Sequence, residues 1–443
     1  MAEPRYYDIR QVRGSVTQID IDNGIVERGD SSFFDETILR ALGDRGWGIF
    51  CADAFDPDSA GARRDALEKA FSLAGYTGEH LELAPAEHGM LDVPAMKEDP
   101  GDVHLDEKIS LLASLEKAAR IDGIVNTRAS YIERTEHVRI ISSEGLDSEY
   151  RMTRCGFTIS AVARRNGLIQ MGRESRHSIL GFNLRHQEEL GLKAAERAVA
   201  LLDAREAKGG RTRVILDPEL AGVFAHEAVG HASEGDLVKE GNSVLAGRIG
   251  ERIGVKELTI VDDPSQKEFG FEPMDAEGSR VKRTEIISRG RVNAYLHSRE
   301  TAAAVGGGDI GHARGMPGEP PLVRMSNTFV EKGDSNLDEI LEACGEGILL
   351  KGSRGGQVDP GRGFFQFNAE YGFAIEKGEM GCLLRDVSLS GEILRTLHQI
   401  VLIGKDLELH QGYCGKGGQT VPVSDGSPHL LLEDAFVGGK GAD

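Results

Sequence analysis

The apolar and polar positions of the first 150 residues follow two different periods in turn. Short β-like runs occur at residues 16–19, 48–51 and 137–142, whereas residues 59–74 and 103–119 have the composition and spacing of helices. Strands that alternate with helices are typical of a layered domain in which helices cover a sheet. We therefore expect an α/β layer domain at the N-terminus.

A hairpin and a long helix close this first region. Residues 155–171 contain two strand-like arms joined near Asn166-Gly167, a pair that favours a two-residue hairpin turn. Residues 186–204 then place their apolar side chains on one side of an amphipathic helix. Lys208-Gly209-Gly210 interrupts the pattern. We place the domain boundary there, which gives one domain over residues 1–208 and a second over residues 209–443.

The second region consists of short apolar runs separated by glycines. Residues 285–296, 372–380 and 382–389 each resemble two strands joined by a tight turn. A mainly β domain with one helix near its start is expected. The predicted fold class is α+β, with an N-terminal α/β layer domain followed by a mainly β C-terminal domain.

Composition and charge narrow the classes of partner. The chain has 443 residues, and 72 acidic against 52 basic side chains give it a net charge of −20. This charge repels phosphate backbones and anionic lipid surfaces, so neither nucleic acid nor a membrane is an expected partner. The first residues lack the features of a signal peptide, which leads us to expect a cytoplasmic protein. Five scattered cysteines without CxxC pairing argue against a disulfide framework.

The strongest chemical signal is the motif His226-Glu227 followed, after three residues, by His231. Residues 212–216 resemble a strand, and Asp217-Pro218 supplies a helix N-cap followed by proline at the first helical position. A helix that begins at Pro218 therefore carries the motif, with Gly235 as a plausible stop. Two imidazoles beside a carboxylate are what a hydrolytic zinc site needs.

The spacing of the two histidines requires a distorted helix. Each residue of an α-helix turns by about 100°, so His226 and His231 would lie roughly 140° apart around the axis. Such side chains cannot share one small ion. Either a π-bulge lets five residues complete about one turn, or Gly230 allows the helix to unwind before His231.

A catalytic zinc ion commonly takes three protein ligands and leaves one position to water. Cys414 is the favoured third ligand, because it lies in a glycine-rich segment where the backbone can approach an ion closely. His410, four residues earlier, is the strongest competitor. The full set of candidates for the third ligand is Cys382, Cys414, His297, His312, His398, His410 and His429.

These motifs together resemble the TldD side of the TldD/PmbA family of metallopeptidases. The resemblance is carried by His-Glu-Ala-Val-Gly-His at residues 226–231, by Ser-Glu-Gly-Asp at 233–236 and by Cys-Gly-Lys-Gly-Gly-Gln-Thr-Val-Pro-Val at 414–423. Residues 274–278, 325–328 and 355–359 add further similarity. The match covers most of residues 217–423, whereas over the first 200 residues it rests on general layout.

The resemblance implies a zinc-dependent peptidase of the metal-binding, active type. In it, His226, His231 and Cys414 hold Zn²⁺ and Glu227 is the catalytic carboxylate. It also implies that the substrates are unfolded peptides, and that the chain forms a heterodimer with a PmbA/TldE-like subunit that lacks the metal motif, or else a homodimer. Glu227 would pass a proton from the attacking water to the leaving amine.

Two other classes of function remain open from the sequence. One is a zinc-stabilised, non-catalytic peptide-binding or regulatory subunit, for which a fourth protein ligand such as His410 or Cys382 would be the sign. The other is an amidase acting on small molecules. Glu227 could also be an ordinary carboxylate on a helix surface. The loops at residues 306–311 and 353–357 are expected near a binding cleft, although plain connectors are the simpler interpretation of both.

Overall fold

The computed structural model describes residues 3–75 and 78–439. Its N-terminal half contains a six-stranded sheet with the order β3-β2-β1-β4-β5-β6, in which every neighbouring pair is antiparallel. The strands are β1 (Tyr6–Asp22), β2 (Ile25–Gly43), β3 (Gly46–Asp53), β4 (Ile124–Ser142), β5 (Asp147–Arg165) and β6 (Leu168–Ser178). The predicted runs at 16–19, 48–51 and 137–142 are parts of much longer strands.

The predicted hairpin at residues 155–171 is confirmed. β5 and β6 pair from Arg165 and Leu168 outward, and Asn166 and Gly167 form the turn with φ angles of 52° and 85°. Two consecutive positive φ angles are what a type I′ turn requires, and asparagine and glycine adopt them readily.

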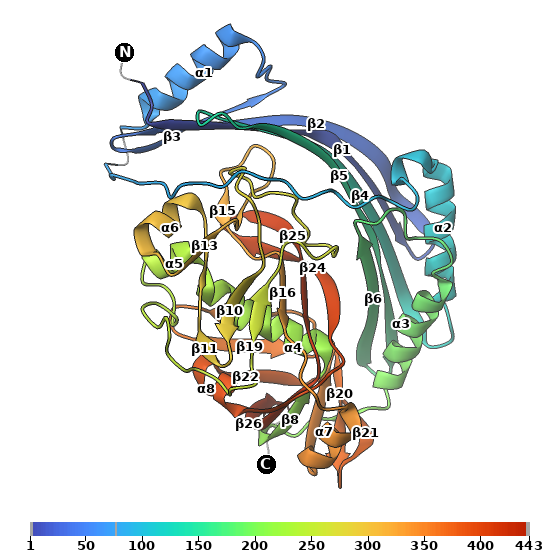
Figure 1. The fold of residues 1–443 in the computed structure, drawn as a ribbon. Coiled ribbons are helices and arrows are strands. Elements are labelled where there is room, and N and C mark those ends of the chain that lie inside the picture. Colours follow the sequence, from blue (N-terminus) through green and yellow to red (C-terminus); the bar gives the residue numbers. More distant parts are fainter. Residues whose placement is uncertain (1–2, 76–77, 440–443) are drawn as a thin grey trace.

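Three helices cover the outer face of this sheet. They are α1 (Ala60–Leu73), α2 (Leu105–Ala118), which follows the short 3₁₀ turn η1 (Pro100–Asp102), and α3 (Glu188–Leu201). Each lies within a range predicted to be helical. Apolar side chains of α2 and α3 pack against those of the sheet in one buried cluster. The sheet curves, with α2 and α3 on its convex side and the C-terminal half of the chain inside the curve (Figure 1).

The C-terminal half is built mainly from two sheets. A ten-stranded sheet has the order β18-β19-β22-β26-β8-β17-β20-β21-β7, with β23 also paired to β26. A six-stranded sheet has the order β11-β10-β9-β16-β25-β24. The bounds in the ten-stranded sheet are β7 (Arg205–Glu206), β8 (Gly210–Leu216), β17 (Gly347–Lys351), β18 (Gly356–Asp359), β19 (Phe364–Asn368), β20 (Tyr371–Glu376), β21 (Glu379–Arg385), β22 (Ser388–Glu392), β23 (Ile400–Ile403) and β26 (Leu430–Gly438).

The second of these sheets and two small ones complete the strands. The six-stranded sheet contains β9 (Ile260–Asp262), β10 (Thr284–Ser288), β11 (Arg291–Val292), β16 (Asn327–Val330), β24 (Glu408–Lys416) and β25 (Gln419–Ser427). Two-stranded sheets are formed by β12 (Tyr295–His297) with β13 (Gly308–Ile310) and by β14 (Ala313–Arg314) with β15 (Leu322–Val323).

Helices pack against these sheets, and the mixture of helices and strands confirms the α+β fold class. They are α4 (Pro218–Phe224), α5 (Gly235–Lys239), α6 (Arg299–Val305), α7 (Leu337–Cys344) and α8 (Ile393–Gln399), together with the short segments η2 (Ala225–Gly230) and η3 (His231–Ser233). α4 lies in the interior of this half (Figure 1), where Leu220 and Phe224 are fully buried in the largest apolar cluster.

One predicted strand pair is wrong. Residues 285–296 and 372–380 contain the expected hairpins β10–β11 and β20–β21. Residues 382–389 instead span the end of β21 and the start of β22, which do not pair with each other. β21 already has β20 on one edge and β7 on the other, so it has no free edge for β22. β22 pairs with β19 and β26.

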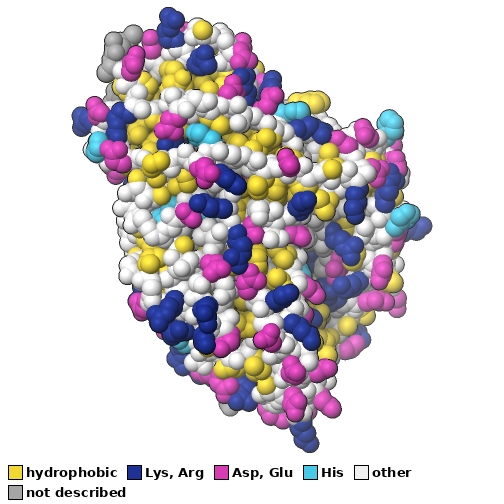
Figure 2. All heavy atoms as spheres, viewed as in Figure 1, with side chains coloured by type: hydrophobic (Ala, Val, Ile, Leu, Met, Phe, Trp, Pro, Cys, Tyr) yellow, Lys and Arg dark blue, Asp and Glu magenta, His cyan; other side chains and the backbone are white. Residues whose placement is uncertain are grey.

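Charges of both signs are interspersed over the face of the molecule in Figure 2, without a continuous basic patch. None of the helices in the described part of the chain combines the length and the apolar character needed to cross a bilayer.

Candidate metal centre

The motif helix begins where the sequence predicts it. β8 ends at Leu216, the Asp217 side chain accepts a hydrogen bond from the backbone N–H of Leu220 at 3.0 Å, and Pro218 occupies the first helical position. The helix then lies directly on β25. A Cβ atom at Gly222 would come within 2.6 Å of the backbone nitrogen of Gly426, so glycine allows this close contact.

A π-helical segment brings the two motif histidines to one side. The segment η2 covers Ala225–Gly230, and the N–H of His231 donates to the carbonyl of His226, five residues earlier. Five residues therefore complete about one turn, and the two imidazole rings lie 5.3 Å apart, nearly perpendicular. The π-bulge is thus the correct one of the two predicted alternatives. Gly230 keeps a helical φ of −56°, and Met325 fills the space beside it.

Cys414 reaches this pair of imidazoles from β24. Its Sγ lies 3.4 Å from Nε2 of His231, and one potential ligand atom each from His226, His231 and Cys414 lies within 4.8 Å of the others. All three side chains are buried. The structure thus brings together residues that are 183 positions apart in the sequence.

The other candidates for a third ligand lie outside this group. His297 bonds to Thr301 and Gly306, and His429 bonds to Asp406 at 2.6 Å. His410 lines the adjacent cavity. Within residues 3–75 and 78–439, the potential metal group consists of two histidines and one cysteine. Cys382, His297, His312, His398, His410 and His429 are not members of it.

The surroundings of Cys414 favour its ionised form. Burial opposes ionisation of the Cys414 thiol, yet the neighbouring His226 and His231 together lower its pKa to about 4, so the ligand form, thiolate, is favoured. Nδ1 of His226 is buried without a hydrogen-bond partner among the described residues. Zinc binds thiolate and imidazole at about 2.3 and 2.0 Å, and a thiolate–imidazole separation of 3.4 Å is compatible with both bonds. The donor set therefore fits Zn²⁺.

A buried network supports His231 from its far side. Nδ1 of His231 lies 3.1 Å from Oε2 of Glu234, and the same oxygen accepts a hydrogen bond from Nζ of Lys416 at 2.9 Å. Lys416 also binds Asp236 at 2.7 Å and the carbonyl of Val323 at 3.0 Å. A carboxylate on the second ring nitrogen fixes the tautomer and orientation of a ligand histidine. Sequence reasoning gave Glu234 no role, although its position three residues after His231 was a usable signal.

The prediction that Gly235 ends the motif helix is wrong. The helical segment ends at Ser233, Glu234 is extended, and Gly235 begins the next helix, α5. Glycine is required there for another reason. A Cβ atom at Gly235 would lie 2.2 Å from Nδ1 of His297, so a side chain would collide with that buried ring.

Glu227 lies at the border between the buried histidines and the solvent. Its side chain is 30% exposed, and Oε2 is 3.7 Å from Nε2 of His231. It also lines a groove of about 790 Å³ together with His226. The structure therefore places Glu227 beside the three buried residues and open to a ligand in the groove.

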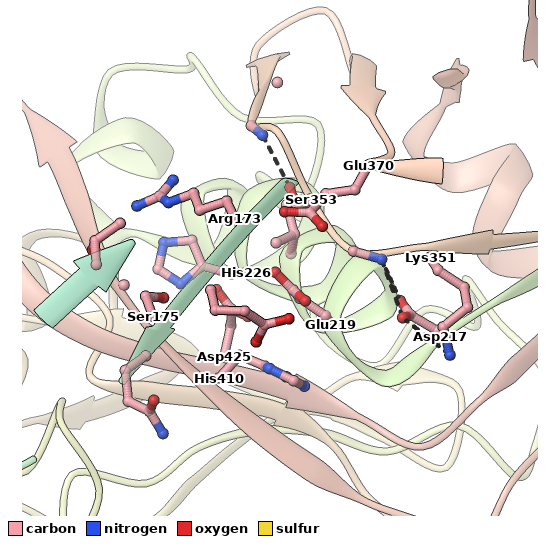
Figure 3. A pocket seen from close by; sticks show the side chains of 18 of the residues that line it. Arg173, Ser175, Asp217, Glu219, His226, Lys351, Ser353, Glu370, His410 and Asp425 are labelled. Carbon is pink, nitrogen blue, oxygen red and sulfur yellow. Dashed lines mark hydrogen bonds and ion pairs between the residues drawn. The ribbon is translucent and has the colours of Figure 1, made fainter. Parts of the chain in front are cut away.

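The groove lies between the two halves of the chain. β6 and α3 of the N-terminal half supply Arg173, His177 and Arg197, and β24 of the C-terminal half supplies residues 410–413. In Figure 3, Arg173 and Ser175 approach from β6, whereas His226, His410, Glu219 and Asp425 gather near the centre. The predicted loop at residues 353–357 contributes Ser353, but the loop at 306–311 does not line this groove.

Two carboxyl groups in the groove are unusually basic. Burial raises the pKa of Glu219 to about 7, and the charges of Glu370 and Asp217 add to the shift. Burial also raises the pKa of Asp425 to about 7. Neither residue stood out from the sequence. The sequence did not indicate the groove residues of β6 either, because they line the groove only where β6 lies beside segments that are distant in the sequence.

Comparisons with known proteins cover almost the whole chain. Residues 7–74 match domain 1 of the PmbA/TldA metallopeptidases, residues 98–202 match the central domain and residues 209–439 match the C-terminal domain.

Similar proteins over almost the full length of the chain come from several organisms. A protein named metalloprotease from Methanothermobacter thermautotrophicus is 38% identical over 98% of this chain and 95% of its own length. A protein named zinc metalloprotease TldD homolog from Saccharolobus solfataricus is 27% identical over 98% and 96% of the two chains. The solved structure of TldE from Thermococcus kodakarensis shares the fold, with a TM-score of 0.79, 19% identity and coverage of 98% and 97%.

Proposed function

Because the chain belongs to the PmbA/TldD family of metallopeptidases, we propose that it is a zinc-dependent peptidase that hydrolyses unfolded polypeptides. The observation that carries this proposal is the convergence of His226, His231 and Cys414 beside a groove lined by His226 and Glu227. A non-catalytic zinc site is usually closed by four protein ligands. The group of three in the described residues favours an open, catalytic site instead.

His226, His231 and Cys414 would hold the cation, with Glu234 fixing the orientation of His231. Bound there, zinc supplies a Lewis acid for the scissile carbonyl and lowers the pKa of a water molecule to about 7. The surrounding residues are almost completely buried. Packing around these buried side chains holds the imidazoles and the thiolate in position, so little reorganisation is needed when charge develops during the reaction.

Glu227 would act as the general base and then the general acid. Its carboxylate is open to the groove and lies 3.7 Å from the ring of His231, within reach of a water molecule next to the three buried residues. Oε2 accepts the proton of the attacking water and afterwards donates it to the nitrogen of the leaving amine. The rest of the glutamate side chain extends from the π-helical segment, so its position depends on that distortion.

The strands beside the groove support an unfolded substrate. β6 is the last strand of the N-terminal sheet, and β24 is the last strand of the six-stranded C-terminal sheet. Both contribute residues to the groove, so it runs between two sheet edges. An extended peptide can bind such edges through its backbone, with little dependence on its side chains. A folded protein does not present a free extended segment of this kind.

A second subunit belongs to the proposal. The similarity of the fold to a protein named TldE supports a heterodimer with a related, metal-free subunit, and a homodimer is the alternative. Mass spectrometry of the complex purified from the native cell distinguishes the two. A homodimer contains one kind of chain, whereas a heterodimer contains two chains of different mass.

The decisive experiment replaces the proposed base. Glu227→Gln should keep one zinc ion per chain but lower the chelator-sensitive hydrolysis of a denatured protein substrate by about 10²- to 10⁴-fold, since the amide cannot take a proton. Glu240→Gln, on an exposed glutamate after α5, serves as the matched control and should retain full activity. Zinc content by elemental analysis and turnover by release of new N-termini are the two measurements. Full turnover by Glu227→Gln would refute the catalytic role.

A further inference from the structure

A second cavity lies between the N-terminal sheet and the C-terminal half. It has a volume of about 240 Å³ and is lined by residues from β1, β4 and β5 on one side and from residues 313–317 and 420–422 on the other. A water molecule occupies roughly 30 Å³ of liquid, so this space admits a small organic group. The cavity contains none of the residues of the metal centre.

Its charged lining is unbalanced. Four arginines line it and only two carboxylates do: Arg10, Arg134, Arg154 and Arg314 face Glu136 and Glu272. Each of these two glutamates already pairs with two of the arginines. Glu136 lies 2.7 Å from Arg134 and 3.8 Å from Arg154, and Glu272 lies 3.0 Å from Arg154 and 2.6 Å from Arg314. Because guanidinium stays charged in proteins, the lining carries an excess of two positive charges.

The arginines are also short of hydrogen-bond partners. Arg10 and Arg314 are 8% and 5% exposed, and the buried Nε atom of each has no partner among the described residues. Arg10 does donate from Nη1 to the carbonyl of Met316, and Arg314 donates to the carbonyl of Met325. A buried cation without a counterion is strongly destabilising. The lining therefore has positive charge and hydrogen-bond donors to spare for an anion.

Tyr413 connects this cavity with the catalytic groove. Its side chain lines both spaces, and it is the neighbour of Cys414 in β24. The ring packs edge-on against Phe269 at 5.4 Å and His177 at 5.8 Å. The ring of Tyr413 thus forms part of the wall that separates the two spaces.

We propose that this arginine-lined cavity binds a carboxylate group. A guanidinium fork matches the two oxygens of a carboxylate, and Nε is one of the donors that such a pair uses. The carboxylate comes from the C-terminus or an acidic side chain of a peptide in the groove, or from a small free acid. The peptide source rests on the proposed function, whereas the carboxylate site itself does not.

Equilibrium binding tests the proposal without hydrolysis. In zinc-loaded Glu227→Gln protein, two fluorescent peptides of one unfolded sequence are compared, one with a free C-terminal carboxylate and one with a C-terminal amide. Charge-assisted bonds in a buried site should make the free carboxylate bind roughly tenfold tighter. Arg10→Gln should remove this difference. Glutarate at constant ionic strength, followed by the thermal unfolding temperature, provides the arm for a free acid.

A second variant and a control protect the conclusion from folding defects. Arg134→Gln removes a more exposed cavity arginine and should also reduce the difference between the peptides. Arg139 lies on the same strand as Arg134 but pairs with Asp58 and Asp147 outside the cavity. Arg139→Gln should therefore leave the difference in affinity between the two peptides intact. Stabilisation by glutarate that Arg10→Gln abolishes, with equal binding of both peptides, would identify a free acid as the ligand.

The two proposals fail separately. If both peptides bind equally and glutarate stabilises neither the parent protein nor the Arg139→Gln control, the carboxylate site is refuted even where the enzyme is active. If zinc-loaded protein without the Glu227 substitution does not hydrolyse peptides but still prefers the free carboxylate, the peptidase proposal fails and the carboxylate site stands.

Discussion

His231 is held from both sides of its ring. Nε2 faces Cys414, and Nδ1 contacts Glu234, which is in turn fixed by Lys416. Because carboxylates behind ligand histidines hold the ring in position, their loss commonly weakens metal binding by about 10- to 100-fold. We expect Glu234→Gln to weaken zinc binding by this factor, as measured by competition with a chromophoric chelator.

The control for this prediction uses the same network. Asp236→Asn removes the other carboxylate of Lys416 without touching His231, so its zinc affinity should change much less. Equal zinc affinity of Glu234→Gln and the parent protein would show that Glu234 does not position the ligand.

Glu219 should make the stability of the protein depend on pH. Burial, followed by the charges of Glu370 and Asp217, raises its pKa from 4.5 to about 7. Between these two pH values the folded protein keeps a proton that the unfolded chain has released. The stability contribution of Glu219 therefore falls as pH rises through this window, by no more than about 3 kcal/mol, and is constant above it.

A neutral replacement reveals this contribution. Glu219→Gln resembles the protonated glutamate, so it should match the parent protein at pH 5 and melt a few degrees higher at pH 8. The thermal unfolding temperatures of both proteins at the two pH values provide the measurement. Glu189→Gln, an exposed glutamate of α3, should show no such change with pH. A constant difference between Glu219→Gln and the parent would contradict the raised pKa.

At the scale of elements, the position of α4 on β25 controls the metal centre. The backbone of Gly222 touches that of Gly426, so a methyl group at residue 222 must push the helix away from the strand. His226 lies four residues further along the same helical run, whereas Cys414 is on β24, which pairs with β25. Displacement of α4 would therefore move His226 away from Cys414.

We expect Gly222→Ala to lower both the unfolding temperature and the zinc affinity. Alanine is intrinsically better than glycine in a helix by about 1 kcal/mol, so any loss must come from the contact. Gly61→Ala in α1 is the matched control, because no atom lies within 4 Å of the added methyl group there. It should be neutral or stabilising. Calorimetry and zinc titration of both variants provide the comparison, and unchanged zinc affinity of Gly222→Ala would argue against this coupling.

The local sequence predicted those parts of the site that depend on one segment. Asp217-Pro218 gave the helix start, and the five-residue step from His226 to His231 required a distortion, which the structure contains as a π-bulge. The ligand roles of both residues and of Cys414 stay predictions until a metal is measured. Gly235 misled because a glycine near a helix end usually marks a stop, whereas here it makes room for His297.

The groove could not be predicted in the same way. Its N-terminal wall comes from β6 and α3, and its other wall comes from β24 and from loops near residue 353. These segments meet only because the long sheet curves over the C-terminal half (Figure 1). Periodicity identifies which residues of a strand share one face, but it does not say what that face will contact.

On the scale of the whole molecule, buried arginines join the two halves. Arg299 of α6 is 2% exposed and donates to the carbonyl of Ala84 and to Glu144, both at 2.9 Å. Arg40 of β2 binds Glu277 at 3.2 Å. These bonds cross the predicted boundary after residue 208, which itself stays a prediction. They hold the sheet against the C-terminal half.

The single tryptophan of the chain can report whether this contact breaks before the rest unfolds. Trp47 of β3 donates to Glu300 of α6 at 3.0 Å and lies under the guanidinium of Arg40. In the parent protein the emission shift of Trp47 and the loss of far-UV circular dichroism should coincide in urea, as expected for one cooperative unit. Arg299→Met leaves the half-exposed Glu144 and the carbonyl of Ala84 without the Arg299 guanidinium, which costs about 1–3 kcal/mol. The Trp47 transition should then move to lower urea by about 1 M and separate from the loss of secondary structure.

Arg185→Met removes an arginine that pairs with Glu98 and Glu107 inside the N-terminal half, so its two transitions should stay together. Coincident transitions in Arg299→Met would mean that the halves separate only when both unfold, and that residues 1–208 do not form an independent unit.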